Sequence, residues 1–230
     1  MPRSSTPRAR KPKHARAFTR RLLAWFARAG RDLPWRRTRD PYRVLVSEVM
    51  LQQTQVSRVV EYYPRFLERF SSLEALARAR PRAVREAWEG LGYYARAANL
   101  HALAREVTSR HDGKLPGDPE RLAKLPGVGR YTAGAVASFA YEKPVPAVDT
   151  NVARVLGRVF FGRREARGGS REIWALARAL VPKDGKRAWR FNQALMELGA
   201  LVCRARTPQC AECPVNGMCR ALQRPPRGRP

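Results

Sequence analysis

The apolar positions along the chain follow the pattern of successive amphipathic helices. Near the N-terminus, apolar side chains recur at the intervals of one helix face, at Phe18, Leu22, Leu23, Trp25 and Phe26. Further helices are predicted over residues 43–55, 73–79, 82–89, 95–110, 131–141, 151–160, 170–181 and 189–202. We find no run of alternating apolar and polar residues and no internal repeat, so the sequence predicts an all-α protein.

Local signals mark one helix start and both chain ends. Asp118 precedes Pro119 and Glu120, the pattern of an N-cap followed by Pro at the first helical position. Residues 1–14 and 223–230 are basic, Pro-rich and poor in large apolar groups, so we expect disordered tails. No apolar run reaches the roughly 18 residues of a membrane span, and we expect no membrane association.

Charge narrows the class of partner. The chain has 230 residues and is 44% hydrophobic, which suits one large or two small domains. It carries 46 Lys and Arg against 19 Asp and Glu, a net charge of +27. A GC-rich genome would explain Arg in place of Lys, but not this excess of bases over acids. We therefore expect nucleic acid as the partner.

The cysteines gather near the C-terminus as Cys203-x6-Cys210-x2-Cys213-x5-Cys219, and the chain has no others. Thiolates this close in sequence can share one metal centre, and Cys suits both iron–sulfur clusters and zinc. Structural zinc sites usually have two close pairs across a longer spacer, whereas here one close pair has a single Cys on each side. The spacing favours a [4Fe–4S] cluster, with zinc and disulfides as alternatives. Disulfides are the weakest, because without an apolar signal segment we expect a reducing cytoplasm.

A glycine-containing turn joins two predicted helices at Leu125-Pro126-Gly127-Val128-Gly129-Arg130-Tyr131-Thr132-Ala133-Gly134. Glycine permits a tight turn and a close approach of the backbone to a ligand. The amides of Val128, Gly129 and Arg130 would lie at the start of the second helix, where phosphates bind. The string resembles the helix-hairpin-helix motif, which holds a DNA backbone without reading its sequence. Gly127, Val128, Gly129 and Arg130 are therefore candidate DNA-binding residues.

Asp149 precedes a helical stripe and, from its neighbours alone, is an ordinary N-cap. The order of hairpin, Asp and four-Cys loop, however, resembles the endonuclease III superfamily of DNA glycosylases, over residues from about 30 to 222. In that superfamily an Asp at this place is catalytic. The resemblance implies two helical lobes with a cleft between them for the base. These are a six-helix barrel over 31–141 and an iron–sulfur domain over 15–30 and 142–222.

Four further strings resemble the MutY-type adenine glycosylases, which remove adenine mispaired with guanine or 8-oxoguanine. They are Leu33-Pro34-Trp35-Arg36, Ser47-Glu48-Val49-Met50-Leu51-Gln52-Gln53-Thr54-Gln55, Gly90-Leu91-Gly92-Tyr93-Tyr94-Ala95-Arg96-Ala97 and Phe191-Asn192-Gln193-Ala194-Leu195-Met196-Glu197-Leu198-Gly199. Relatives that nick DNA carry a Lys where this chain has Tyr131. Without that amine no Schiff base forms there, so we expect a monofunctional enzyme.

The resemblance also implies roles for single residues. Glu48 alone is a helix glutamate, but apolar and uncharged neighbours favour a carboxyl that keeps its proton. The resemblance makes Glu48 the general acid at adenine N7 and ionised Asp149 the stabiliser of an oxocarbenium-like sugar, with Tyr131 and Asn151 as supporting partners. The target nucleotide must be flipped out of the duplex.

Further residues are assigned to DNA contact. Gln53 and Tyr93 resemble the residues that wedge into the duplex, although alone they are a surface Gln and a core Tyr. Arg36 and Gln52 complete the candidate DNA-binding set. The cluster is expected to hold a basic loop against DNA rather than to perform redox chemistry, and the basic residues of that loop are Arg204, Arg206 and Arg220.

Two departures from the adenine glycosylases keep alternatives open. Their C-terminal domain, which helps to recognise 8-oxoguanine, is expected to be absent, and Thr150 stands where they have Gly beside the catalytic Asp. Both features are shared with short glycosylases that remove thymine from G·T pairs. A non-catalytic DNA-binding module is the third alternative, although it would not need both Glu48 and Asp149. We expect a monomer at the nucleoid that acts on double-stranded DNA containing a mispair.

Overall fold

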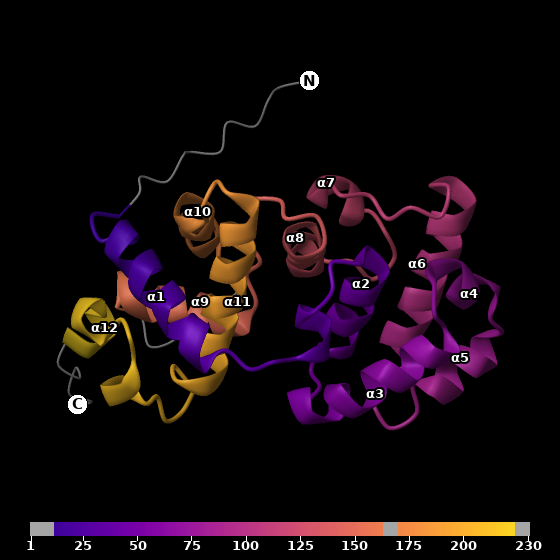
Figure 1. Cartoon of the computed structure of the whole chain (residues 1–230), viewed down its shortest axis with the longest axis horizontal. Helices are drawn as coiled ribbons and strands as arrows, with labels where there is room; N and C mark the ends of the chain where they lie inside the picture. Colours follow the sequence, from indigo (N-terminus) through magenta and orange to yellow (C-terminus); the bar gives the residue numbers. More distant parts are fainter. Residues whose placement is uncertain (1–11, 163–169, 224–230) are drawn as a thin grey trace, which may run out of the picture. The chain divides into compact units, whose positions relative to one another are not determined.

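The structure is a computed structural model that describes residues 12–162 and 170–223. The chain divides into two compact units (Figure 1), a terminal unit of Met1–Arg31 with Pro144–Pro230 and a central unit of Asp32–Lys143. Over the described ranges the regular elements are helices and none is a strand, which confirms the predicted all-α fold. The predicted tails lie outside these ranges except for residues 12–14 and 223. No helix in the described ranges is both long and apolar enough to cross a membrane.

The terminal unit is built around its longest helix, α11. Its helices are α1 (Ala15–Ala29), α9 (Thr150–Leu156), α10 (Arg171–Leu180), α11 (Gly185–Leu201) and α12 (Arg220–Gln223), with a π-helical turn at Gly157–Phe161 after α9. Helix α11 packs against α1 and against α9 (Figure 1). Two short turns, Cys210–Glu212 and Asn216–Met218, follow α11 and lead into α12.

The apolar stripe of α1 packs into the core of the terminal unit. Phe18 and Leu22 are fully buried and Trp25 is nearly so. The Phe18 ring meets Phe160 edge to face at 5.0 Å and Phe191 at 6.4 Å between ring centroids. Edge-to-face rings add directional contact to the free energy of burial. The predicted N-terminal helix is therefore confirmed, and its apolar face shares one core with apolar residues of α9, α10 and α11.

The central unit holds seven α-helices and one short turn. They are the turn Pro34–Arg36 and helices α2 (Pro41–Met50), α3 (Val56–Arg69), α4 (Leu73–Arg78), α5 (Pro81–Ala87), α6 (Ala95–Arg110), α7 (Pro119–Leu122) and α8 (Arg130–Phe139). Helix α2 packs on α8, and α4 packs on α6. Trp88 is fully buried and meets Phe66 edge to face at 5.6 Å. This core supports the two segments that carry the predicted acid and the hairpin.

Most helix boundaries follow local sequence, although α11 begins at Gly185 rather than at 189 and α12 was not predicted. The predicted cap is confirmed, since the Asp118 carboxylate accepts the Glu120 and Arg121 amides at 3.1 and 2.9 Å. The helix predicted over 43–55, however, ends at Met50, and the next residues form a turn. Helix α3 was not predicted, and it contains Pro64, which lacks the backbone donor of a helix interior.

Candidate functional site

Glu48 and Tyr131 form a hydrogen-bonded pair in the central unit. Glu48 lies on α2 with 3% of its surface exposed, and Tyr131 is the second residue of α8. The Tyr131 hydroxyl donates to Glu48 Oε2 at 2.7 Å across 83 residues of sequence. A buried carboxyl needs such a donor, because without one it loses the hydrogen bonds that water would supply. The two candidate residues are therefore brought together.

In the turn after α2, the neighbouring residues Gln52 and Gln53 have different surroundings. Gln52 is half-buried, and its Nε2 donates to Thr132 Oγ1 on α8 at 3.4 Å, next to Tyr131. Gln53 is exposed and has a φ of 54°, in the left-handed backbone region that residues other than glycine rarely adopt. Gln52 thus stands beside the Glu48–Tyr131 pair, while Gln53 lies at the surface.

The glycine hairpin between α7 and α8 has a backbone that requires glycine at its first position. Gly127 has a φ of 72°, and a Cβ there would lie 2.6 Å from Asn99 Cβ. Val128 is buried, and its amide donates to the Leu125 carbonyl at 3.1 Å rather than outward. Gly129 is the N-cap of α8, has no side-chain cap, and is exposed together with Arg130. An uncapped, exposed helix start of this kind suits an anion.

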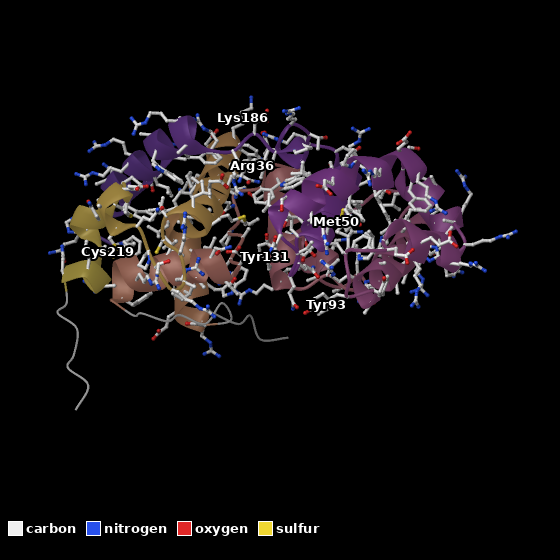
Figure 2. All side chains as sticks on the ribbon, turned by 90° about the horizontal axis from the view of Figure 1, so that it is seen from below. Arg36, Met50, Tyr93, Tyr131, Lys186 and Cys219 are labelled. Carbon is white, nitrogen blue, oxygen red and sulfur yellow. The ribbon has the colours of Figure 1, made fainter. Side chains whose placement is uncertain are left out.

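Tyr93 is a surface residue, although an isolated tyrosine is more often found in a core. Its side chain is 63% exposed, and its φ is 47°. Figure 2 labels its side chain in the central unit. The core alternative for Tyr93 is therefore wrong. Arg36, a further candidate for DNA contact, ends the turn Pro34–Arg36 and is half-buried next to buried Trp35.

Asp149 caps α9 in the terminal unit, as its local sequence predicts. Its Oδ1 accepts the Val152 amide at 2.7 Å, and its Oδ2 accepts Asn151 Nδ2 at 3.0 Å. Asn151 Oδ1 in turn accepts Arg154 Nη2 at 2.7 Å. Arg154 also donates from Nε to the Cys203 carbonyl at 2.8 Å. A continuous chain of hydrogen bonds therefore runs from the Asp149 carboxylate to the backbone of Cys203.

Two opposing effects act on the Asp149 carboxyl. Desolvation by burial raises its pKa above the ordinary value, because the charged form loses water. The Val152 amide, Asn151 and the positive charge of Arg154 favour the charged form and lower the pKa, but burial has the larger effect. Ionising Asp149 in the folded protein therefore costs free energy. A positive charge appearing next to it would recover part of that cost.

Close backbone packing holds Asn151 against α11. A Cβ on Gly199 would lie 2.6 Å from Asn151 Cβ, so only glycine allows this approach. The Gly199 carbonyl also accepts Arg154 Nη2 at 2.9 Å. Buried Asn192, on the same helix, donates to the Val145 carbonyl at 2.9 Å and accepts the Ala147 amide at 3.4 Å. Helix α11 thus fixes both the segment before Asp149 and Asn151, two residues after it.

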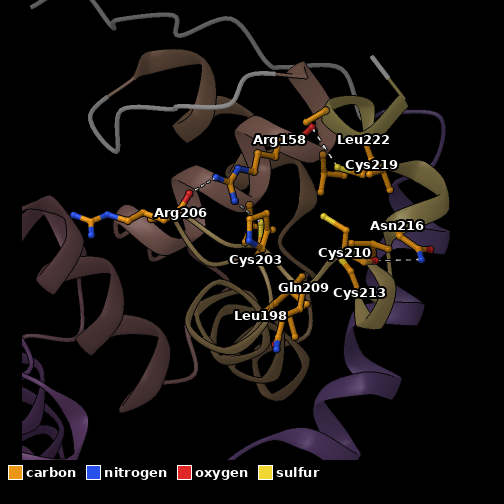
Figure 3. A pocket seen from close by; sticks show the side chains of 17 residues that line it. Arg158, Leu198, Cys203, Arg206, Gln209, Cys210, Cys213, Asn216, Cys219 and Leu222 are labelled. Atoms are coloured by element: carbon orange, nitrogen blue, oxygen red, sulfur yellow. Dashed lines mark hydrogen bonds between the residues drawn. The ribbon is translucent and has the colours of Figure 1, made fainter. Parts of the chain in front are cut away.

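The four cysteines line one cavity of about 430 Å³ (Figure 3). Its walls come from the π-helical turn, the end of α11 and the loop that follows, and none of the cysteines forms a disulfide. Burial raises the pKa of the Cys213 thiol to about 11, and the nearby thiols Cys203, Cys210 and Cys219 also raise it. Each added thiolate charge would repel the others, so four thiolates here require a positively charged centre.

The donor set fits an iron–sulfur cluster. In the part of the chain that the structure describes, no three Cys, His, Asp or Glu side chains are placed to hold a single metal ion. The thiols instead surround a common space that a polynuclear centre can fill. Arg158 donates from Nη1 to Cys203 Sγ at 3.5 Å, and holds the Arg204 and Ala205 carbonyls at 2.7 and 2.8 Å. Hydrogen bonds to ligand sulfurs tune such clusters.

Three arginines that organise these segments were not predicted from the sequence. Arg154 and Arg158 connect α9 and its π-helical extension to the cysteine loop, and buried Arg96 connects two turns of the central unit. In sequence each looks like one more basic residue of a chain with 46 Lys and Arg. Only the spacing of Arg154, three residues after Asn151 on the same helix face, offered a signal.

Comparisons with known proteins agree with this geometry. The adenine DNA glycosylase of Rattus norvegicus is 46% identical over 93% of this chain, which spans only 43% of the rat protein. The thymine-DNA glycosylase of Aeropyrum pernix is 40% identical over 88% of this chain and 93% of that protein. The solved structure of a thermostable thymine-DNA glycosylase superposes with a TM-score of 0.85 at 32% identity, covering 92% of this chain and 97% of that one.

Two family models match successive parts of the chain. The iron-sulfur binding domain of endonuclease III matches residues 203–219, which begin at Cys203 and end at Cys219, and confirms the predicted cluster and its position. The second model matches residues 46–183, more than half of the chain, and includes Glu48, the hairpin and Asp149. The chain therefore belongs to the HhH-GPD superfamily of base excision DNA repair proteins.

Proposed function

We propose that this protein is a monofunctional DNA glycosylase that hydrolyses the N-glycosidic bond of adenine mispaired with guanine or 8-oxoguanine in duplex DNA. The observation that carries the proposal is the buried Glu48 carboxyl, which accepts the Tyr131 hydroxyl at 2.7 Å. A proton donor of this kind is what the departure of a purine requires. The 46% identity to the rat adenine glycosylase supports adenine as the base.

Glu48 acts on the base. The bond between the sugar and the base breaks with its electron pair going to the base, which is a poor leaving group as an anion. Glu48 gives its proton to adenine N7 and so makes the departing base neutral. The carboxylate that remains accepts a proton from the incoming water, whose oxygen bonds to the sugar carbon. Glu48 is thereby reprotonated, and the net reaction is hydrolysis.

Asp149 acts on the sugar. Loss of the base leaves an oxocarbenium-like centre, which an ionised carboxylate stabilises either electrostatically or as a covalent adduct. Burial raises the pKa of Asp149, so its charge is poorly solvated and interacts strongly with a nearby cation. Asn151 and the Val152 amide hold the carboxylate oxygens at 3.0 and 2.7 Å, which fixes the direction of that charge.

DNA binding is assigned to the hairpin and to exposed basic residues. A net charge of +27 favours a polyanion, and Figure 2 shows many side chains that end in nitrogen along the ribbon of both units. Gly127, Gly129 and Arg130 would take a backbone phosphate. Gln53 and Tyr93, both exposed, would enter the duplex while the target nucleotide is flipped. The iron–sulfur cluster, held by the four cysteines, would support the basic loop that carries Arg204 and Arg206.

The proposal is tested by single-turnover excision on four labelled duplexes, with A opposite 8-oxoguanine, A opposite G, T opposite G and U opposite G. We expect adenine release from the first two, with strand breaks only after alkali, because Tyr131 offers no amine for a Schiff base. Strand breaks without alkali would contradict the monofunctional assignment. Absence of adenine release would contradict the adenine assignment.

Thymine excision from G·T pairs is the second candidate. It is supported by the 40% identity to the thymine-DNA glycosylase of Aeropyrum pernix and by the TM-score of 0.85 to the solved thymine-DNA glycosylase. The same four duplexes separate the two functions. If thymine is released and adenine is not, Thr150 becomes the first residue to exchange for Gly. It is exposed in the first turn of α9, directly after Asp149.

A further inference from the structure

Two exposed turns of the central unit have unusual backbone conformations. In the turn between α2 and α3, Gln53 has a φ of 54°. In the turn between α5 and α6, Gly90, Gly92 and Tyr93 have φ values of 90°, 70° and 47°. Left-handed conformations at Gln and Tyr cost free energy, and they persist only where surrounding contacts impose them. Contacts from elsewhere in the central unit must therefore hold both turns.

Arg96 supplies these contacts. It is the second residue of α6 and is buried, with 8% of its surface exposed. Its Nη1 donates to the end of α2, at the carbonyls of Val49 (3.1 Å) and Met50 (2.9 Å), and to the first turn, at the carbonyl of Gln52 and at Thr54 Oγ1 (3.1 Å). Its Nη2 donates to the second turn, at the carbonyls of Leu91 and Gly92 at 3.1 and 3.0 Å. One guanidinium thus binds both turns at once.

Aromatic rings complete the surroundings of this guanidinium. Its carbon lies 5.5 Å from the ring centroids of both Trp88 and Tyr93. The Trp88 indole donates to the same Gly92 carbonyl at 3.2 Å. In the described part of the chain no carboxylate neutralises Arg96, and burial lowers its pKa. The charge is held by carbonyl dipoles and ring faces, an arrangement that lysine cannot reproduce with a single ammonium.

We infer that Arg96 is a positioning residue that presents Gln53 and Tyr93 to DNA as one rigid pair. The inference rests on the proposed function and goes beyond it, because it assigns to a residue that touches neither base nor sugar the task of arranging two that enter the duplex. Holding both turns before DNA arrives removes an ordering cost from base flipping.

Arg96→Lys tests the inference, with Arg69→Lys as the matched control. Arg69 also pairs with an acceptor, Glu86 at 3.2 Å, and lies 5.7 Å from the Phe70 ring, but on the surface of the same unit. Four quantities are compared with wild type. They are hydrogen exchange of the free protein, affinity for a duplex with a tetrahydrofuran abasic site opposite G, fluorescence of 2-aminopurine opposite G, and the single-turnover rate on A opposite G.

We expect Arg96→Lys to speed exchange in residues 51–54 and 90–93 selectively, to reduce the 2-aminopurine signal, and to slow excision by about 10²-fold, the cost of a small misplacement. Affinity for the abasic duplex, in which no base needs displacing, should change only a few-fold. Cluster absorbance should stay near wild type, the melting temperature should fall because buried hydrogen bonds are lost, and Arg69→Lys should change none of these quantities. Loss of abasic-duplex affinity in parallel with the excision rate, or unchanged exchange in both turns, would overturn the inference.

Gly92→Ala keeps the test decisive if Arg96→Lys fails to fold. A Cβ at Gly92 meets no atom within 4 Å, but its φ of 70° strains any side chain, so the change disturbs the turn without crowding the core. We expect the same separation between abasic-duplex affinity and 2-aminopurine signal, and an equal loss of both would overturn the inference. If wild type released no adenine, the proposed function would fail. Hydrogen exchange in the free protein would still test whether Arg96 holds both turns.

Discussion

The Arg154 guanidinium donates to Asn151 Oδ1 at 2.7 Å, and the same side chain donates to the Cys203 carbonyl at 2.8 Å. The residue that supports Asp149 is therefore tied to the first cysteine of the cluster cavity. Neither end of this connection can shift without loss of a charge-assisted hydrogen bond, which is typically about 1.5–3 kcal/mol. The terminal unit thus couples the cysteine loop to the candidate sugar-stabilising carboxylate.

Gly199→Ala tests whether the close approach of α9 to α11 matters for chemistry. The new Cβ would stand 2.6 Å from Asn151 Cβ, so α9 and α11 must shift apart to accommodate it, which disturbs the position of Asn151. We expect single-turnover adenine release to fall by about 10²-fold, as displacements of this size do, while cluster absorbance is retained. Ala200→Ser, at the exposed neighbouring position, is the control. Wild-type rates in Gly199→Ala would show that Asn151 does not need this position.

Tyr131→Phe removes the hydroxyl that donates to Glu48 at 2.7 Å and leaves the ring. A buried acceptor that loses its donor costs about 1–3 kcal/mol, so we expect a lower melting temperature and a several-fold to hundredfold slower excision. The measurement is thermal unfolding alongside single-turnover kinetics. Tyr94→Phe, in which a half-exposed tyrosine loses its hydroxyl, should leave both near wild type. An unchanged rate in Tyr131→Phe would remove Tyr131 from the site.

Asp149→Asn should change how stability depends on pH. Burial raises the pKa of Asp149 in the folded protein above its unfolded value, so the fold favours the protonated form. Wild type therefore loses stability as pH rises from below the unfolded pKa through the folded pKa, and the Asn variant does not share this loss. We expect the melting temperature of the variant minus that of wild type to be larger at pH 8 than at pH 4. A difference that shrinks as pH rises would contradict the raised pKa.

Cys213→Ser should remove one cluster ligand. Burial raises the pKa of this thiol to about 11, so without a positively charged centre it would stay protonated, and its place in the cavity wall is consistent with ligation. We expect loss of the brown visible absorbance and a lower melting temperature. Met218→Leu, which alters a partly buried neighbour of the same core, serves as the control. A Cys213→Ser protein that stays coloured and folded would show that the ligand set is misassigned.

Local patterns predicted most helices and the cysteine ligands, because these depend on neighbours in sequence. The α1 stripe at Phe18 and Leu22 is buried, and Asp118 caps its helix as its spacing indicates. The helix predicted over 43–55 was too long, since Arg96 binds the carbonyls of Val49 and Met50 from 47 and 46 residues away and the chain turns there. No local pattern contains that contact.

In the candidate site, too, local sequence predicted some residues, whereas contacts made only by the fold were missed. Motif strings identified Glu48, Tyr131, Asp149 and Asn151, and the structure joins them as two hydrogen-bonded pairs. The arginines that hold these pairs and turns were missed, because a buried Arg is defined by the carbonyls around it. Those carbonyls come from segments that only the fold brings together.

The central claim is that Glu48 is the proton donor for base release, and Glu48→Gln tests it most directly. The amide keeps an acceptor for the Tyr131 hydroxyl but cannot give a proton to adenine. Single-turnover release of adenine opposite G should fall by about 10²–10⁴-fold, with melting temperature and affinity for an abasic duplex retained. Glu68→Gln, at an exposed position of α3, should match wild type. Adenine release by Glu48→Gln within a few-fold of wild type would contradict the account.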